Sequence, residues 1–526
     1  MFLALVFVAV LLLFLYLKYY VTFNYWQRRG VKFEKTHSIF GNIGKNILQR
    51  QSMADLIANI YKKHSEEPYF GIFTFMNPTL VVKDPEIIKE IAVKNIDNFI
   101  THKLFSSGDG SHVFSKNLFA TSGSIWRNTR PSLSPAFTGS KMRAMYDLVN
   151  ECSMQWFKTF EAKNEETILV NLKEDIIIRF TIDVISTCIF GLKSNSFEDK
   201  NNEFFKRAHS VGDFGGNKIF ALFGYCIPQF IVKMFDLRIV PNDDQEFFER
   251  VVMETIKMRV QNNIVRPDMI NLLMDSRKGK LTHDTDGDLN DTGFATIEES
   301  SLGKSKVNGE MADDEIVGHS LLFLIAGSDT TACGLTFLIY ELALHSDIQQ
   351  RLYEEIAEYL EEGKGKISYE NILKMKYLDM VCSETLRKWP PLPVTDRCTS
   401  RPYEIKSENK KSLRLESGTV VWFPVFSIHR DPKYYEDPER FDPERFSDEN
   451  KDKINKDAYL PFGVGPRACI GSRLAMLMFK SILVHILNNF EVVPVEKTPI
   501  PLELSKKHIF LNPNSPVWLG LKRRTH

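Results

Sequence analysis

The chain opens with an apolar run and then changes to an amphipathic pattern. Residues 2–17 carry no charged side chain, and a helix of that length spans roughly 24 Å. Apolar residues up to Phe23 extend the run to the roughly 30 Å of a bilayer core if Lys18 reaches the interface. No basic segment precedes the run and no small-residue cleavage site follows it, which favours an uncleaved anchor over a signal peptide. Positive charges follow the run, so the body of the protein is predicted to lie in the cytosol.

Downstream of the anchor, helical periodicity dominates. We expect a membrane anchor at residues 1–26, a polar linker at 27–49 and one domain at 50–526. Apolar runs at residues 79–82 and 419–423 predict strands, so the fold class is mainly α with a small β region. Residues 277–314 are rich in Lys, Asp, Gly, Ser and Thr, which predicts a solvated loop between two long helices.

Composition narrows the functional classes. The 526 residues include 67 Lys and Arg and 67 Asp and Glu, and this zero net charge gives no reason to expect a nucleic-acid partner. The seven cysteines are odd in number and lack CxxC spacing. They indicate a reducing compartment and argue against a disulfide framework or a zinc site.

A buried helix is predicted to begin at Asp313, because acidic residues occupy its first turn and most of its faces are apolar. Gly327, Asp329 and Thr330 interrupt the apolar pattern, and the Thr330 hydroxyl can bond to a carbonyl one turn back. A buried aspartate is costly without a partner, which points to a purpose for this segment. The alternative is a capped or solvated kink.

A second distinctive segment surrounds Cys469. Gly463, Gly465 and Gly471 allow positive φ and close approach of the backbone to a flat ligand, and a helical pattern follows Gly471. Cys469 would lie at the start of that helix, where free N–H groups stabilise a thiolate. Taken alone, Cys469 could equally be a buried structural cysteine.

The spacing Phe-x-x-Gly-x-Arg-x-Cys-x-Gly is met by Phe462, Gly465, Arg467, Cys469 and Gly471. It resembles the cysteine loop of the cytochrome P-450 superfamily of haem-thiolate monooxygenases. The resemblance implies the fold of that family, haem b as cofactor and Cys469 as the axial metal ligand, with Phe462, Arg467 and Gly471 beside the cofactor.

Other motifs extend the resemblance along the chain. Asp329 and Thr330 resemble the acid and the alcohol of the family's oxygen-binding groove, which supply protons for oxygen cleavage. Trp126 and Arg130, at i and i+4, resemble a pair that binds a haem propionate. Arg397 is a weaker propionate candidate.

A structural triad is also implied. Glu384 and Arg387 resemble the family's Glu-x-x-Arg motif, and spacing to the cysteine loop favours Arg445 over Arg440 as the third member. For the substrate side, the helix face before Thr330 and segments that line pockets in relatives suggest candidates that could equally be core residues: Phe114, Phe214, Leu322, Ile325, Ala326 and Val394.

Segments 131–142 and 212–216 resemble the insect microsomal branch, whose members often oxidise plant toxins and insecticides. This implies a monooxygenase of lipophilic xenobiotics in the endoplasmic reticulum membrane, with its catalytic domain facing the cytosol. Electrons would come from NADPH through NADPH–cytochrome reductase, with cytochrome b5 as a second candidate donor. Arg127, Lys141 and Arg143 could offer a basic docking surface, or be an ordinary solvated face.

Three other functions stay open. The substrate could be an endogenous hormone or lipid. An oxygen-independent haem-thiolate isomerase is a second alternative, although such enzymes tend to lose the acid–alcohol pair. A non-catalytic haem sensor is the third, and it has no use for a proton path.

Overall fold

The computed structural model describes residues 20–104, 113–163, 165–216, 218–278, 293–305, 311–406 and 412–524. The predicted apolar anchor at residues 2–17 lies outside them. The α-helices are α2 (Tyr25–Arg28), α3 (Gly44–Ile47), α4 (Met53–Lys63), α5 (Pro85–Lys89), α6 (Gly123–Leu133), α7 (Gly139–Glu161), α8 (Ile178–Ile185), α9 (Glu203–Gly212), α10 (Lys218–Leu222), α11 (Gln229–Met234), α12 (Asn242–Asn262), α13 (Met269–Arg277), α14 (Asp313–Leu344), α15 (Ser346–Glu362), α16 (Tyr369–Lys374), α17 (Lys376–Lys388), α18 (Val425–Ile428) and α19 (Ser472–Asn489).

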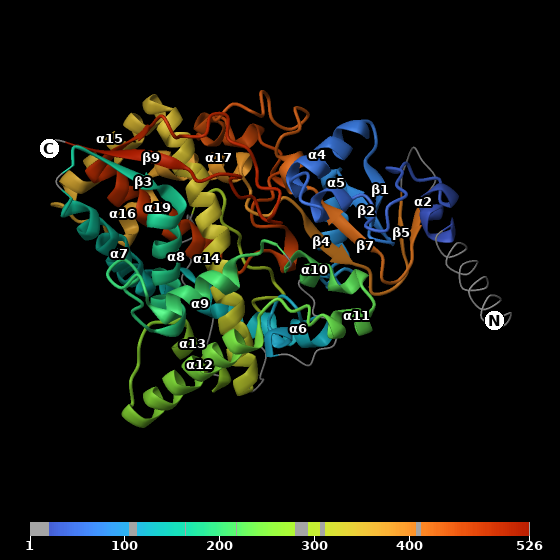
Figure 1. Ribbon diagram of the computed structural model, residues 1–526, viewed down its shortest axis with the longest axis horizontal. Helices are drawn as coiled ribbons and strands as arrows, with labels where there is room; N and C mark the ends of the chain where they lie inside the picture. The colour runs from blue at the N-terminus through green and yellow to red at the C-terminus, as the bar shows by residue number, and fades with distance from the viewer. Residues whose placement is uncertain are drawn as a thin grey trace, which may run out of the picture.

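In the described part of the chain, the β-strands form three small sheets: β1, β2, β4 and β7 lie together beside the helices, whereas β3 and β9 lie among the helices on the other side (Figure 1). They are β1 (Tyr69–Thr74), β2 (Asn77–Val82), β3 (Thr167–Asn171), β4 (Thr395–Cys398), β5 (Tyr403–Ile405), β6 (Leu413–Leu415), β7 (Val420–Phe423), β8 (Phe490–Pro494) and β9 (Trp518–Arg523). The largest sheet has the order β1-β2-β7-β4. Strands β2 and β7, both predicted from their apolar runs, are parallel neighbours in it, with Thr79 opposite Val420. The mainly helical fold with a small β region is confirmed.

Helix α14 crosses the helical part of the molecule (Figure 1). Its first turn is acidic, as predicted, and the Glu315 side chain accepts a hydrogen bond from the Ala312 backbone N–H at 2.8 Å. Its most apolar stretch is long enough to span a membrane, but 78% of that stretch is buried inside the protein. Within the described residues, α14 is therefore a core helix.

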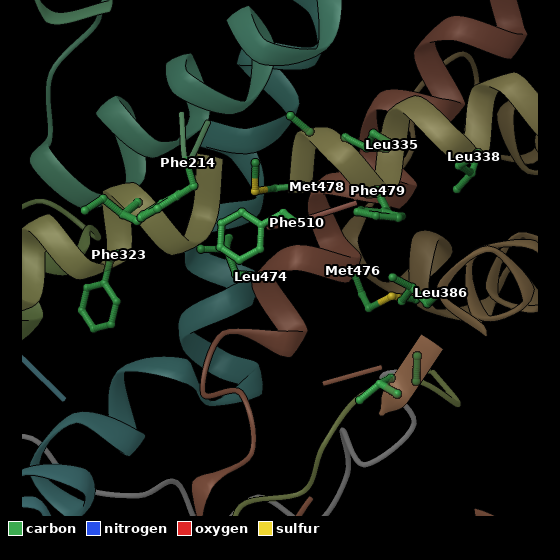
Figure 2. Packing of buried hydrophobic residues seen from close by; sticks show 14 of the residues in the cluster. Phe214, Phe323, Leu335, Leu338, Leu386, Leu474, Met476, Met478, Phe479 and Phe510 are labelled. Atoms are coloured by element: carbon green, nitrogen blue, oxygen red, sulfur yellow. The ribbon is translucent and has the colours of Figure 1, made fainter. Parts of the chain in front are cut away.

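Helices α14 and α19 pack closely, and Figure 2 shows Leu335 of α14 beside Phe479 of α19. The close approach depends on Gly334, where an added Cβ would lie 2.4 Å from Cζ of Phe479. Phe479 is itself buried, so it cannot swing into solvent. This contact brings the helix that follows Cys469 against the helix that carries Asp329 and Thr330.

The segment predicted as a polar linker, residues 27–49, differs from that expectation. Val31 and Ile43 are buried, and Phe33 and Gly41 form isolated bridges to strand β1. Just before it, the indole N–H of Trp26 donates to the Ile72 carbonyl at 3.0 Å. Apolar side chains scattered among the polar residues give this segment a surface to bury, so the folded body begins before residue 50.

The loop predicted as solvated at residues 277–314 is also only partly so. Residues 293–305 lie against the helical body, with Ala295 buried and Phe294 packed on Phe446 and Tyr459. Its polar side chains meet protein partners that come from distant parts of the chain, which composition could not reveal.

Substituting Gly334 by Ala tests the helix contact. The added methyl group must displace the Phe479 ring, so we expect a loss of about 1–3 kcal/mol, offset only in part by the roughly 1 kcal/mol that alanine gains over glycine in a helix. Thermal unfolding measures the loss. The control is Gly224→Ala, because a Cβ at Gly224 meets nothing within 4 Å. Equal unfolding temperatures for the two variants would contradict the packing described here.

Candidate functional site

The loop before α19 is closed by its own main chain. The Cys469 N–H donates to the Phe462 carbonyl at 2.8 Å, and the Ala468 N–H donates to the Gly465 carbonyl at 2.8 Å. Gly465 has φ +72°, and a Cβ there would lie 2.2 Å from the Ala92 carbonyl oxygen, so only glycine fits. Gly471 differs from the expectation of positive φ: it has φ −94° and precedes the first turn of α19.

The Cys469 side chain is exposed, whereas the other six cysteines are buried or half-buried. Burial nevertheless raises the pKa of its thiol, opposed by a hydrogen bond from the Gly471 backbone and by the positive charge of Arg130. The thiol is thus accessible, although the surrounding protein disfavours its charged form. Such a position suits a ligand to a bound metal group.

Two arginines lie in or beside the loop, the buried Arg397 and the half-buried Arg467. Arg397 donates to the carbonyls of Asp396 at 2.7 Å and Val464 at 3.0 Å, and burial lowers its pKa to about 10. Arg467 donates to the carbonyls of Ile100 at 2.6 Å and Leu118 at 2.9 Å. Burial, together with the charges of Arg397 and Arg130, holds the pKa of Arg467 well below its ordinary value. The region therefore holds more buried positive charge than its carboxylates balance.

The predicted pair on α6 lies at the same place. The Trp126 ring is 4.4 Å from the Arg467 guanidinium carbon, and its indole N–H is buried without a partner in the described structure. Arg130 donates to the Ala468 carbonyl at 3.0 Å and to the Glu299 carboxylate at 2.7 Å. Glu299 thus pairs with an arginine that the resemblance assigns to a propionate.

Helix α14 is buried on most faces but opens in its middle. Ala326 is exposed, and Leu322 and Thr330, one turn to either side of it, are half-buried. The Thr330 hydroxyl donates to the Ala326 carbonyl, which leaves its oxygen free to accept. The cysteine loop is close: a Cβ at Gly471 would lie 3.8 Å from Phe137, whose ring packs on Phe323 of α14.

Asp329 is buried and paired. Its Oδ1 accepts from the Lys173 ammonium at 3.0 Å, while Oδ2 is buried without a partner in the described residues. Lys173 lies in the short π-helix η4 (Leu172–Ile177) and also donates to Asn512 at 2.5 Å. Burial alone would lower the pKa of Lys173, but the Asp329 carboxylate outweighs it and raises that pKa above its ordinary value. The partner that a buried aspartate requires is thus Lys173.

The predicted substrate-side residues separate in space. Leu322 and Ala326 lie on the open face of α14, whereas Ile325 and Phe114 are buried. Phe214 is fully buried and packs on Phe510, with ring centroids 5.1 Å apart; Figure 2 shows both rings. Val394 lines an apolar cavity elsewhere, together with Met53, Leu104, Phe223, Leu392, Pro393, Trp422 and Ile509.

The structure brings the predicted triad together. Arg387 donates to both oxygens of Glu384, at 2.7 and 2.8 Å, and both side chains are fully buried, whereas Arg445 is half-buried. Nε of Arg445 lies 3.6 Å from Oε1 of Glu384. Arg440 contributes only its main-chain carbonyl, which accepts from Arg387. Burial raises the pKa of Glu384, opposed by the hydrogen bond and charge of Arg387.

Comparison with known proteins agrees with this geometry. Residues 31–520 match the family model of cytochrome P450. The chain belongs to the cytochrome P450 family. It is 40% identical to cytochrome P450 9e2 of Blattella germanica (96% of this chain, 94% of the relative) and 38% identical to cytochrome P450 6k1 of the same species (99% and 97%). Probable cytochrome P450 9f2 of Drosophila melanogaster is 35% identical (95% of each chain). The protein is accordingly a monooxygenase of the oxidoreductase class.

Cytochromes P450 bind haem, and the residues present here fit that group. Haem carries two propionates, and the site offers cations for them in the buried Arg397 and the half-buried Arg467. Two buried donors lack a protein acceptor in the described structure, the indole N–H of Trp126 and Nε–H of Arg397. Cys469 would ligate the iron, and Ala326 and Thr330 would leave room beside it. These features are expected of a site that binds haem, which carries two negative charges and a metal ion.

Several residues of this cytochrome P450 site were missed by the sequence. Lys173 and Glu299 each contact a predicted residue from a distant element. Asp396 precedes Arg397 and pairs with His102, with Nδ1 and Oδ1 2.9 Å apart. No local spacing marks them. The only available signal was the need of each buried charge for a counter-charge.

Replacing Lys173 by Met tests the buried pair. The change leaves Asp329 unpaired, so we expect a loss of about 3 kcal/mol of unfolding free energy, measured by denaturant unfolding at equal haem content. Adding Asp329→Asn should recover most of the loss, because no buried charge then remains. The exposed pair of Lys193 and Glu151 supplies the control: Lys193→Met should cost less than about 1 kcal/mol. Additive losses in the double variant would argue against coupling between Lys173 and Asp329.

Proposed function

We propose that this cytochrome P450 inserts one atom of molecular oxygen into lipophilic small molecules, with xenobiotics such as plant toxins or insecticides as the substrate class. Electrons would come from NADPH through NADPH–cytochrome reductase. The observation that carries the proposal is the open face of α14, where Thr330 and Ala326 lie next to the paired acid Asp329.

The cofactor site would be held from several directions. Cys469 would ligate the haem iron, with Phe462 and Gly471 beside it, and Trp126, Arg397 and Arg467 would bind the propionates. Arg130 can share that role through the N–H groups that Ala468 and Glu299 leave free. When bound, thiolate-ligated haem supplies the electron donation that favours O–O cleavage.

Proton delivery would fall to this chain's own residues. The Lys173 ammonium holds a proton at Oδ1 of Asp329, and its side chain is 18% exposed against 7% for Asp329. Lys173 would therefore hold Asp329 in place as a carboxylate, whose unpaired Oδ2 can accept and pass on a proton. Thr330 would orient the last acceptor in the path through its free oxygen lone pairs. An isomerase or a haem sensor has no need of such a path.

The lining favours an apolar substrate. Leu322 and Ala326 offer no hydrogen-bonding side chain on the open face of α14. A site of this kind selects by shape and hydrophobic burial. That selectivity suits a range of lipophilic xenobiotics better than one polar metabolite.

Attachment to the endoplasmic reticulum membrane is part of the proposal, with residues 1–26 as the anchor and the catalytic domain in the cytosol. Trp26 is already buried in the body, so a membrane span ending near it would hold the domain close to the lipid. Helix α11 exposes Phe230 and Met234, which is costly in water and favourable at a membrane surface.

The basic cluster considered for reductase docking is partly neutralised. Arg143 pairs with Glu370 at 2.8 Å, and Arg127 pairs with Asp97. Lys141 alone of the three has no ion pair of this kind in the described structure. Reductase, with or without cytochrome b5, would then recognise a mixed surface on this part of the protein.

Replacing Cys469 by Ala tests the ligand assignment. With the thiolate gone, we expect complete loss of the carbon-monoxide difference band of thiolate-ligated ferrous haem, and loss of NADPH-dependent product with added reductase. Cys382→Ala is the matched control, because Cys382 is buried in α17 away from the loop, and should keep both signals. A thiolate band in the Cys469→Ala protein would refute the assignment.

Replacing Thr330 by Ala tests proton delivery. We expect the fraction of consumed NADPH recovered as oxygenated product to fall by about tenfold, with hydrogen peroxide rising in its place, because a positioned proton donor is lost. Thr336→Ala is the control: the Thr336 hydroxyl makes the same bond to a carbonyl one turn back, but on a buried face. Unchanged coupling in Thr330→Ala would exclude the proposed role.

A further inference from the structure

Residues 293–305, here called the strap, touch three elements around the cysteine loop. The sequence predicted only a solvated loop for this stretch. Its contacts reach α17, the first turn of α19, and α6. They lie on both sides of Cys469, which sets this segment apart from an ordinary surface connection.

One end of the strap is fixed on α17. The Phe294 N–H donates to Asp379 at 2.9 Å, and the same carboxylate lies 2.8 Å from the buried ammonium of Lys480. The Phe294 ring packs between Phe446 and Tyr459, with centroids 5.0 and 5.4 Å away. A half-buried ring packed on two aromatic side chains and a hydrogen bond to a paired carboxylate fix this end of the strap.

The middle of the strap bonds to the residue that opens α19. The Ile297 N–H donates to the Ser472 hydroxyl at 3.2 Å. Ser472 is buried and follows Cys469 by three residues. This contact holds the chain on the C-terminal side of the thiol.

Glu299 holds the other side. Its Oε2 accepts from Nε and Nη2 of Arg130 at 3.1 and 2.7 Å and from the Ser134 hydroxyl at 2.8 Å. Its Oε1 accepts from the Ser300 N–H at 3.0 Å, so the strap's own backbone orients the carboxylate. Arg130 in turn donates from Nη1 to the carbonyl of Ala468, which directly precedes Cys469.

The pair of Glu299 and Arg130 is largely buried, with side-chain exposures of 13% and 5%. It differs in this from the exposed ion pairs that contribute little to stability. Arg130 also lies close enough to Arg467 to lower the pKa of that arginine. A carboxylate at Glu299 therefore both fixes the direction of the Arg130 fork and offsets charge that would otherwise accumulate around the loop.

We propose that Glu299 is a positioning residue for Cys469: through Arg130 and the Ala468 carbonyl, and together with the bond from Ile297 to Ser472, the strap holds the cysteine loop in the geometry that ligates iron. The proposal rests on Cys469 being the iron ligand. Glu299 does not touch the thiol and acts only through its partners.

The test replaces Glu299 by Gln in the full-length, haem-loaded protein. Gln keeps the size of the side chain but not its charge, so Arg130 loses its ion pair and the Ala468 carbonyl loses a fixed donor. We expect the thiolate-type carbon-monoxide band to convert to the form without thiolate ligation about tenfold faster than in the unmodified protein. Hydrogen exchange of the peptide covering residues 465–472 should rise, and the reduction potential should move in the positive direction because a nearby negative charge is removed.

Two further variants make the outcome specific. Glu299→Asp keeps the charge and should recover part of the band stability and most of the potential. Glu298→Gln removes a charge from the exposed neighbouring residue and should change none of the three measurements. If Glu299→Gln matches Glu298→Gln in band stability and exchange, the positioning role is refuted. Failure of the ligand assignment would appear separately, as a thiolate band that survives Cys469→Ala.

Discussion

Three guanidinium groups hold the main chain around Cys469, and two of them, those of Arg130 and Arg397, are buried. Arg130 binds the Ala468 carbonyl, Arg397 binds that of Val464, and Arg467 extends from the loop to the carbonyls of Ile100 and Leu118. Arginine suits this use because its planar fork keeps several donors in fixed directions and stays charged when buried. The same choice creates the main electrostatic constraint of the molecule, since buried cations are stable only beside anions or acceptors. Asp396 and Glu299 satisfy part of that need.

Helix α14 reconciles two opposite demands. To cross the interior it must be apolar on most faces, yet the chemistry requires a polar pair in its middle. Asp329 pairs with Lys173, which also donates to Asn512, whereas Thr330 lies on the open face of the helix. Neighbouring residues on a helix point about 100° apart, so adjacent positions reach two environments. The acid is thereby paired on one side of the helix, while the alcohol lies on the open side.

The motif residues could be predicted because each motif is local. Cys469 with its glycines, or Glu384 with Arg387, sit within one turn or one loop, where spacing determines geometry. Their partners could not be found in this way, since Glu299 lies 169 residues beyond Arg130 and Lys173 lies 156 residues before Asp329. The prediction of a solvated loop at residues 277–314 was only partly correct for the same reason. Its polar composition is typical of a solvated segment, and only the fold reveals that part of it contacts buried charges. Composition indicates that a buried charge needs a partner, but not which residue supplies it.

The charge arrangement has a consequence for stability. Burial lowers the pKa of Arg397 and of Arg467, so keeping both side chains charged in the folded state reduces the free energy of unfolding. Haem, with its two negatively charged propionates, would bind only the folded chain. Its binding would offset that cost and would therefore be linked to folding. The third arginine, Arg130, has a counter-charge within the chain, the Glu299 carboxylate. Retention of the cofactor and ligation by the thiolate would therefore depend on contacts that overlap at Arg130, which joins Glu299 of the strap to the Ala468 carbonyl.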